Sequence, residues 1–164
     1  FLEVPLKFNQ FYLFQNWLDF SKDIYLNEKK KAKNKIINYE KLPKIIGCEI
    51  NKNVFEQAEL NISLAGLENY IELINNDFLE LQLKSNPGII ICNPPYGKKL
   101  GNENELIYLY EEMGIFLKKN FSGWEFWLLS GNSKLTKYLK MKSSLKIPVS
   151  NGGIDCRWIK YLIR

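Results

Sequence analysis

The chain has 164 residues and no histidine, and its 23 Lys and Arg against 18 Asp and Glu give a formal net charge of +5. A chain of this length can bury one hydrophobic core, and the lack of histidine excludes Ser-His-Asp and Cys-His nucleophile systems, histidine general bases and histidine metal ligands. The mildly basic charge is compatible with a polyanionic partner but does not require one.

The three cysteines, Cys48, Cys92 and Cys156, are far apart and form no C-x-x-C pair. Cys48 and Cys92 stand within apolar runs, which favours small buried thiols in a reducing compartment over a disulfide or a metal site. No apolar stretch approaches the roughly 18 residues that a membrane span needs. We therefore expect a soluble, cytoplasmic protein that binds no metal.

The first quarter of the chain is rich in aromatic and basic side chains. Leu2, Leu6 and Phe8 fit the tail of a helix, and residues 11–20 are expected to form an ordered loop packed on a core. The charge run at residues 28–35 predicts a helix with one solvated face. Its lysines could instead contact nucleic-acid phosphates, but the solvated face is the preferred interpretation.

From residue 43 onward, short apolar runs alternate with segments in which apolar residues recur at the spacing of a helix. Residues 44–50 form a short apolar run that predicts a buried strand. Asn53 is a candidate N-cap with Glu56 three residues later, the spacing of a capping box, and Gly66 is a typical helix stop. The apolar residues between them share one helical face: Val54, Phe55, Ala58, Ile62 and Ala65.

Two more strands are predicted at residues 70–75 and 88–92, and the second is ended by the sequence Asn93-Pro94-Pro95-Tyr96-Gly97. A helix is predicted over residues 103–119, because apolar side chains recur there at helical spacing. These apolar side chains are Leu106, Leu109, Tyr110, Met113, Phe116 and Leu117.

The last third of the chain predicts a strand at residues 123–131, a short helix at 132–139, and two closing strands at 144–149 and 155–163 around an Asn-Gly-Gly turn. Strands that alternate with helices and are continuously apolar indicate an α/β fold with a mostly parallel sheet. The closing hairpin would add antiparallel pairing.

Polar residues follow the ends of three predicted strands, where open α/β sheets bind their ligands. Glu49 follows the first strand and Asp77 the second. A carboxylate at a strand end can accept two hydrogen bonds from a ribose diol. Acidic residues also end strands simply because they become solvent-exposed there, and Asp77 could merely cap the next turn, so both interpretations stay open.

The segment after the third strand is more specific. Consecutive prolines fix the backbone and cannot continue a central strand. Pro94 and Pro95 would therefore hold the Asn93 side chain and nearby carbonyls at the sheet edge, where an amino group can be bound, while Tyr96 offers a flat face to a planar base. The alternative is a stiff turn with a surface aromatic residue, which we disfavour because all four residues directly follow a buried strand.

The sequence Asn93-Pro94-Pro95-Tyr96 resembles the catalytic motif of S-adenosylmethionine-dependent methyltransferases that modify exocyclic or amide nitrogens. Longer segments narrow the resemblance to the catalytic domain of the THUMP-associated ribosomal RNA guanine-N2 methyltransferases. They are FQNWLDF, NISLAGLEN, NPPYGKKLG, SGWEFWLLSGN and NGGIDCRWIKYLIR. The resemblance covers nearly the whole chain and implies a Rossmann-like class I methyltransferase sheet.

The resemblance also implies roles for the motif. Asn93 and Pro94 would accept the two hydrogens of the target amine, and Tyr96 would stack on a flipped-out base; Pro95 belongs to the same catalytic motif. Asn93 would also lie against the cofactor. Such a transfer depends on acceptors and alignment, so it needs no histidine.

S-adenosyl-L-methionine is the implied cofactor and ribosomal RNA the implied partner. Glu49 matches the ribose-binding acid of the family, and Asp77 with Phe78 matches the segment that contacts the cofactor adenine. Lys98 and Lys99 follow the catalytic motif. They could meet RNA phosphate, although an exposed loop pair with no role is equally compatible with the sequence.

The resemblance fails at the beginning of the chain. No segment here matches the family's first strand and its glycine-rich cofactor loop, and residues 1–3 resemble the helix just after that loop. In the family that first strand lies between the strands that end at Glu49 and Cys92. We therefore expect residues 1–164 to form a partial methyltransferase catalytic domain with an incomplete cofactor site.

Two other functions remain open. An adenine-N6 methylase of DNA or RNA would use the same motif. A non-catalytic nucleic-acid-binding remnant would keep the fold but not the cofactor loop.

Overall fold

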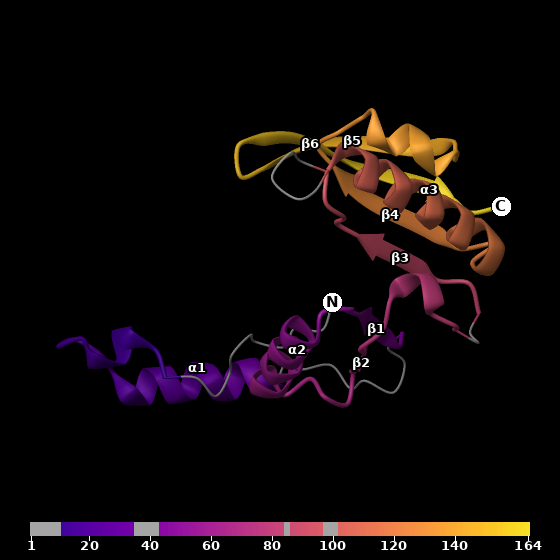
Figure 1. Ribbon diagram of the computed structural model, residues 1–164. Coiled ribbons are helices and arrows are strands. Elements are labelled where there is room, and N and C mark those ends of the chain that lie inside the picture. The colour runs from indigo at the N-terminus through magenta and orange to yellow at the C-terminus, as the bar shows by residue number, and fades with distance from the viewer. Residues whose placement is uncertain (1–10, 35–42, 84–85, 97–101) are drawn as a thin grey trace. The chain divides into compact units, whose positions relative to one another are not determined.

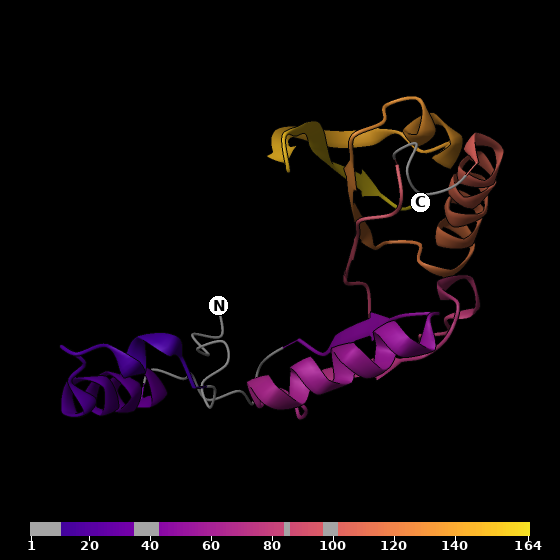
Figure 2. The same cartoon turned by 60° about the vertical axis from the view of Figure 1, so that its left-hand side comes forward.

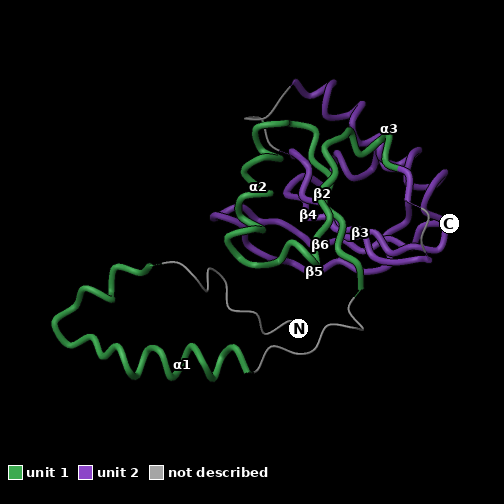
Figure 3. Tube along the Cα trace, turned by 90° about the horizontal axis from the view of Figure 1, so that it is seen from below, with its two compact units in different colours: residues 1–81 green, residues 82–164 purple. Residues whose placement is uncertain are grey.

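The computed structural model describes residues 11–34, 43–83, 86–96 and 102–164 (Figure 1). It divides into two compact units, residues 1–81 and residues 82–164, which are coloured separately in Figure 3. The first unit contains a two-stranded sheet and the second a four-stranded sheet. Among the described helices, none combines the length and apolar character needed to cross a membrane.

The first described segment consists of a short 3-10 turn, Leu13–Asn16, and helix α1, Lys22–Asn34. The basic helix expected here is confirmed. The loop before it is not packed on a core, because Leu13 and Leu18 are exposed. Its aromatic rings instead contact one another, from Tyr12 and Phe14 through Trp17 and Phe20 to Tyr25. The predicted helical tail at Leu2, Leu6 and Phe8 lies outside the described residues.

The first unit then forms a parallel strand pair. Strand β1, Ile45–Cys48, runs beside β2, Ile71–Ile74, with Ile45 opposite Ile71. Helix α2, Lys52–Ala65, connects the two strands. Both predicted strands are confirmed in place, and a helix is the usual connection between parallel strands. The first of them was predicted to be buried, and this is wrong: Ile45 is exposed and the rest of β1 is only half-buried.

The two ends of α2 differ in how well the sequence predicted them. Its N-cap is Asn51, whose side chain accepts hydrogen bonds from the backbone N–H groups of Asn53 and Val54. The predicted cap at Asn53 is therefore wrong, because the short connection from β1 starts the helix two residues earlier. Gly66 ends the helix with φ of 68°, as predicted, since glycine adopts this left-handed conformation without a Cβ penalty.

The second unit holds a mixed sheet. Its strands are β3, Ile89–Cys92; β4, Glu125–Ser130; β5, Ser143–Asn151; and β6, Ile154–Leu162. The order is β3-β4-β6-β5, in which β3 and β4 are parallel and the other two pairings are antiparallel. The α/β class and the closing hairpin are confirmed. The four-stranded sheet is mixed instead of mostly parallel, because the hairpin places β6 directly beside β4 in antiparallel pairing.

Helix α3, Glu103–Asn120, lies along one face of this sheet (Figure 1; Figure 2). A capping box starts it: Asn102 accepts from the backbone N–H of Asn104, and Glu105 accepts from that of Asn102. A short 3-10 helix at Leu135–Leu139 replaces the helix predicted at 132–139. The core side chains of this unit include Leu106, Tyr110, Met113, Leu117, Phe126, Leu128, Leu139, Ile159 and Tyr161.

Gly114 allows α3 to approach the 3-10 helix closely. A Cβ at this position would overlap the carbonyl oxygen of Leu139 and lie 2.9 Å from its Cα. Alanine normally favours a helix over glycine by about 1 kcal/mol, but overpacking against backbone costs about 1–3 kcal/mol. We predict that Gly114→Ala lowers the free energy of unfolding by about 1–2 kcal/mol, measured by urea denaturation.

The neighbouring Ile115→Ala is the matched control. Ile115 is 53% exposed, so its truncation leaves stability within about 0.5 kcal/mol of the parent protein. A Gly114→Ala protein as stable as the parent would contradict the close packing of α3.

Candidate functional site

In the first unit, β1 and β2 end at the same edge of their sheet, and side chains connect the loops that follow. The Asn75 side-chain amide donates to the backbone carbonyls of Glu49 and Ile50, at 2.7 and 3.3 Å. The Cys48 thiol donates to the Asn76 carbonyl at 3.2 Å. These bonds hold the segment before Asp77 against the end of β1. Sequence reasoning missed Asn75, which it took as the last residue of a predicted strand; the observed strand ends one residue earlier, at Ile74.

Two carboxylates lie at this edge, and both are half-buried. Glu49 accepts a hydrogen bond from the Asn51 backbone N–H at 2.8 Å, and Asp77 accepts one from the Leu79 N–H at 2.9 Å. Asp77 therefore does cap the next turn, at Phe78–Glu80. Burial, followed by the charges of Asp77 and Glu49, raises the pKa of the Cys48 thiol. The edge is thus rich in hydrogen-bond acceptors and suited to ligands with hydroxyl and amino donors.

In the second unit, β3 ends at Cys92 and the chain turns at two prolines. Asn93 is exposed, Pro94 is buried and Pro95 is half-buried. Burial raises the pKa of the preceding Cys92 thiol to about 11, so this thiol stays protonated at neutral pH. The buried Pro94 therefore stands next to an exposed Asn93 side chain at the strand end, as the sequence predicted. The prediction that β3 is itself buried is wrong, because β3 lies at the edge of the described sheet, where Ile89 and Ile91 are 61% and 71% exposed.

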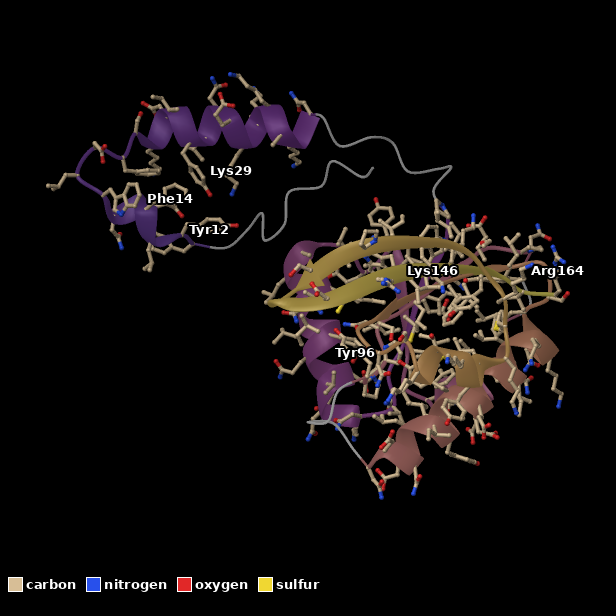
Figure 4. All side chains as sticks on the ribbon, turned by 90° about the horizontal axis from the view of Figure 1, so that it is seen from above. Tyr12, Phe14, Lys29, Tyr96, Lys146 and Arg164 are labelled. Carbon is tan, nitrogen blue, oxygen red and sulfur yellow. The ribbon has the colours of Figure 1, made fainter. Side chains whose placement is uncertain are left out.

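Tyr96 is held by hydrogen bonds from three residues of the second unit. Its hydroxyl accepts hydrogen bonds from the Asn151 side-chain amide at 3.1 Å and from the Cys156 thiol at 3.5 Å. Its backbone carbonyl accepts from the Asn132 side chain at 3.5 Å. The Cys156 contact raises the pKa of the Tyr96 phenol, while the Asn151 bond acts in the opposite direction. The phenol remains neutral, with its ring held against the hairpin (Figure 4).

A glycine at the end of β4 leaves room for this ring. A Cβ at Gly131 would lie 2.9 Å from a Tyr96 ring carbon and 3.2 Å from an Ile154 methyl group. Sequence reasoning missed Gly131, Asn151 and Cys156 as partners of Tyr96. The hydrogen-bonding partners lie 55 and 60 residues further along the chain, so no local pattern could indicate them.

The predicted site residues thus fall into two groups, one in each unit. Glu49, Asp77 and Phe78 follow the strands of the first unit, and the four residues Asn93, Pro94, Pro95 and Tyr96 follow β3 in the second. Lys98 and Lys99 lie outside the described residues. Within the described ranges, no group of three or more His, Cys, Asp or Glu side chains is placed to hold a metal ion.

Comparisons with known proteins cover nearly the whole chain. The family model for the RMKL-like methyltransferase domain matches residues 4–160. A relative from Synechocystis is 34% identical over 157 residues, which is 96% of this chain. The ribosomal RNA large subunit methyltransferase K/L of Photobacterium profundum is 34% identical over 154 residues, or 92% of this chain.

A solved structure shares the fold. The solved protein is a putative methyltransferase that was crystallised as a complex with SAH. Its structure superimposes on this chain with a TM-score of 0.80, at 22% sequence identity over 96% of this chain. The chain spans 41% of the Synechocystis relative, 22% of the Photobacterium relative and 41% of the solved structure. The α/β methyltransferase-like fold is therefore shared by proteins considerably longer than this chain.

The placement of Tyr96 can be tested through Gly131. We predict that Gly131→Ala displaces the Tyr96 ring and breaks its bond to Asn151, because the ring is the movable partner in the overlap. The Asn151 side-chain amide resonances in an NMR spectrum should then move toward those of a solvent-exposed amide. Tyr96→Phe, which removes only the hydroxyl, should produce the same shift. Unchanged Asn151 resonances in both variants would contradict this placement.

Proposed function

Because the chain belongs to the RMKL-like methyltransferase domain family, we propose that it is part of the catalytic domain of an S-adenosylmethionine-dependent methyltransferase that modifies the N2 amino group of a guanine in large-subunit ribosomal RNA. The observation that carries this proposal is the strand end at Asn93-Pro94-Pro95-Tyr96. There an exposed amide side chain follows β3 directly, next to the buried Pro94, and an aromatic ring is held nearby. Such an enzyme would work in the cytoplasm, where ribosomal RNA is made in bacteria.

The acceptors of the first unit fit the cofactor that the family uses. S-adenosylmethionine supplies a methyl group already activated on a sulfonium. Glu49 would accept hydrogen bonds from its ribose hydroxyls, since the carboxylate has lone pairs beyond the one used by Asn51. Asp77 and Phe78 would bind the adenine, one as an acceptor and the other as an apolar contact, and Asn93 would border the methyl-carrying end.

The motif of the second unit would activate the amine. The lone pair of an aromatic amine is conjugated into its ring, which makes the nitrogen a weak nucleophile. The Asn93 side-chain oxygen and the Pro94 carbonyl would accept the two amine hydrogens and draw the nitrogen toward tetrahedral geometry. Transfer would form the nitrogen–carbon bond as the carbon–sulfur bond breaks, and the amine proton would then pass to solvent water. Alignment supplies most of the rate, as in other reactions of two held partners.

Tyr96 would stack on the target base after the base leaves its helix. The bonds from Asn132 and Asn151 and the contact with Cys156 support this role, because a ring that is already fixed loses little entropy when a base stacks on it. Lys98 and Lys99 remain proposed contacts to the RNA backbone beside the motif.

Adenine N6 is the second candidate target, because Asn93 and Pro94 would accept the hydrogens of that amine equally well. The similarity to a ribosomal RNA large subunit methyltransferase favours guanine in RNA. A non-catalytic remnant of the fold would transfer no methyl group, so an activity measurement separates it from both enzymes.

Asn93 provides the first test. We predict that Asn93→Ala in the intact protein lowers the rate of methyl transfer to ribosomal RNA by about 100-fold or more, the typical cost of losing one transition-state acceptor or donor. Affinity for S-adenosylhomocysteine should stay within a few-fold. Asn104→Ala, at an exposed position in the first turn of α3, is the control and should retain full activity. An Asn93→Ala protein as active as the parent would remove the assigned role.

Glu49 provides a test of the cofactor side. We predict that Glu49→Gln weakens S-adenosylhomocysteine binding by roughly 10- to 100-fold in a calorimetric titration, because bonds to a charged acceptor are worth about 1.5–3 kcal/mol. The control is Glu56→Gln, on the exposed side of α2, which should bind as the parent does. Equal affinity in all three proteins would show that Glu49 does not contact the cofactor.

A further inference from the structure

The positive charge of this protein is concentrated near the C-terminal end of the sequence. Residues 134–164 contain eight Lys and Arg residues and one acidic residue, Asp155. The whole chain has a net charge of only +5, so the rest of the sequence has no net positive charge. The charge run of α1, which the sequence makes conspicuous, is offset by acidic residues elsewhere in the chain.

The register of β6 explains where part of this charge lies. Residues two apart on a strand share a face, so Tyr161, Ile159 and Arg157 point to the same side of the sheet. Tyr161 and Ile159 are buried on the side covered by α3, whereas Arg157 is exposed. On the neighbouring strand, Lys146 pairs with Ile159 and is exposed too. One face of the sheet therefore changes from core to polar surface along its length.

This polar stretch is the floor of a cleft of about 800 Å³. The segment around the 3-10 helix forms the opposite wall and contributes Lys137. Lys137, Lys146 and Arg157 line the cleft together with one carboxylate, Asp155. Hydroxyl groups stand between the charges, on Ser130, Ser133, Thr136, Ser143 and Ser150.

A second cleft of about 350 Å³ adjoins the first, because Met141 and Ser143 line both. Its lining holds four cations and no carboxylate: Lys118, Lys140, Lys142 and Arg164. Lys140 is 3.4 Å from Glu111, an ion pair that leaves the other three cations without an ionic partner among the described residues. We name the two clefts together the basic cleft; Figure 4 labels Lys146 and Arg164, which lie in its two parts.

The basic cleft starts at the residues that hold the candidate catalytic motif. Gly131 and Cys156 both line the first cleft. Gly131 also lies against the Tyr96 ring, and the Cys156 thiol donates a hydrogen bond to the Tyr96 hydroxyl. A chain that follows the basic cleft therefore arrives beside Tyr96.

Building on the proposed RNA methyltransferase function, we propose that the basic cleft binds the phosphodiester backbone of the RNA strand that flanks the target nucleotide. Lysine and arginine neutralise phosphates and release counterions, and serine and threonine hydroxyls commonly bond to phosphate and sugar oxygens. The aromatic residue of the lining, Tyr161, is buried and offers no stacking surface. The contacts would therefore hold the backbone without reading the bases.

An anionic membrane would be the other partner of a basic surface, and the lining argues against it. Membrane-binding surfaces place cations around protruding apolar side chains that enter the lipid. Here the cations surround a concave surface lined by hydroxyls, and Ile159 and Tyr161 within it are buried. A narrow polyanion fits such a surface, whereas a flat bilayer does not.

The test uses Lys137→Gln, Lys146→Gln and Arg157→Gln combined in the intact protein, with binding measured by fluorescence anisotropy on a labelled single-stranded RNA. We predict that affinity falls by about ten-fold or more at physiological salt. The slope of log affinity against log salt concentration should become shallower by about 2, because each lost phosphate contact on a single strand changes this slope by about 0.7. A charge-preserving variant, Lys137→Arg, Lys146→Arg and Arg157→Lys, should bind RNA with most of the parent affinity.

The matched control neutralises three exposed lysines of α1, Lys22→Gln, Lys30→Gln and Lys33→Gln, and should leave both affinity and slope unchanged. Parent-like RNA binding by the triple cleft variant would overturn the proposal, and so would a loss confined to binding of phosphatidylglycerol vesicles. Either result would leave the proposed function standing if methyl transfer by the parent protein still depends on Asn93. A parent protein that neither transfers methyl groups nor binds RNA would overturn both.

Discussion

Proline has no backbone N–H to donate to a neighbouring strand, so two prolines in succession end the pairing of β3 with β4 at Cys92. This constraint places Asn93 at the carboxyl end of a strand with its side chain exposed, while Pro94 stays buried beneath it. The direction of the chain after the prolines brings Tyr96 to the end of β4 and to the closing hairpin. The candidate chemistry of the second unit therefore depends on where one strand is made to stop.

The remaining features of that unit support this strand end. Gly131 leaves space for the Tyr96 ring, and Asn151 with Cys156 fixes its hydroxyl. The hairpin that supplies these two partners also supplies Lys146 and Arg157 to the basic cleft. One hairpin would thus hold the base-stacking residue and the backbone of the same RNA. In the first unit, Asn75 plays a comparable part by joining the loop after β2 to the end of β1.

Local patterns in the sequence predicted what local interactions decide. Three features depend on neighbouring residues, and all three are confirmed: the end of β3 at Cys92, the stop of α2 at Gly66 and the apolar stripe of α3. The N-cap of α2 was misplaced because Asn51 and Asn53 are both good caps, and the length of the connection from β1 decides between them. The partners of Tyr96 and the lining of the basic cleft depend on strand register and on elements far apart in the chain, which periodicity alone does not specify.

The central claim is that the Asn93 end of β3 presents a guanine N2 amine to the cofactor methyl group. The most direct measurement incubates the intact protein with large-subunit ribosomal RNA and S-adenosylmethionine carrying a deuterated methyl group, then digests the RNA and identifies the labelled nucleoside by mass spectrometry. The account predicts the label in N2-methylguanosine. Label in N6-methyladenosine, or RNA without any label, would contradict it.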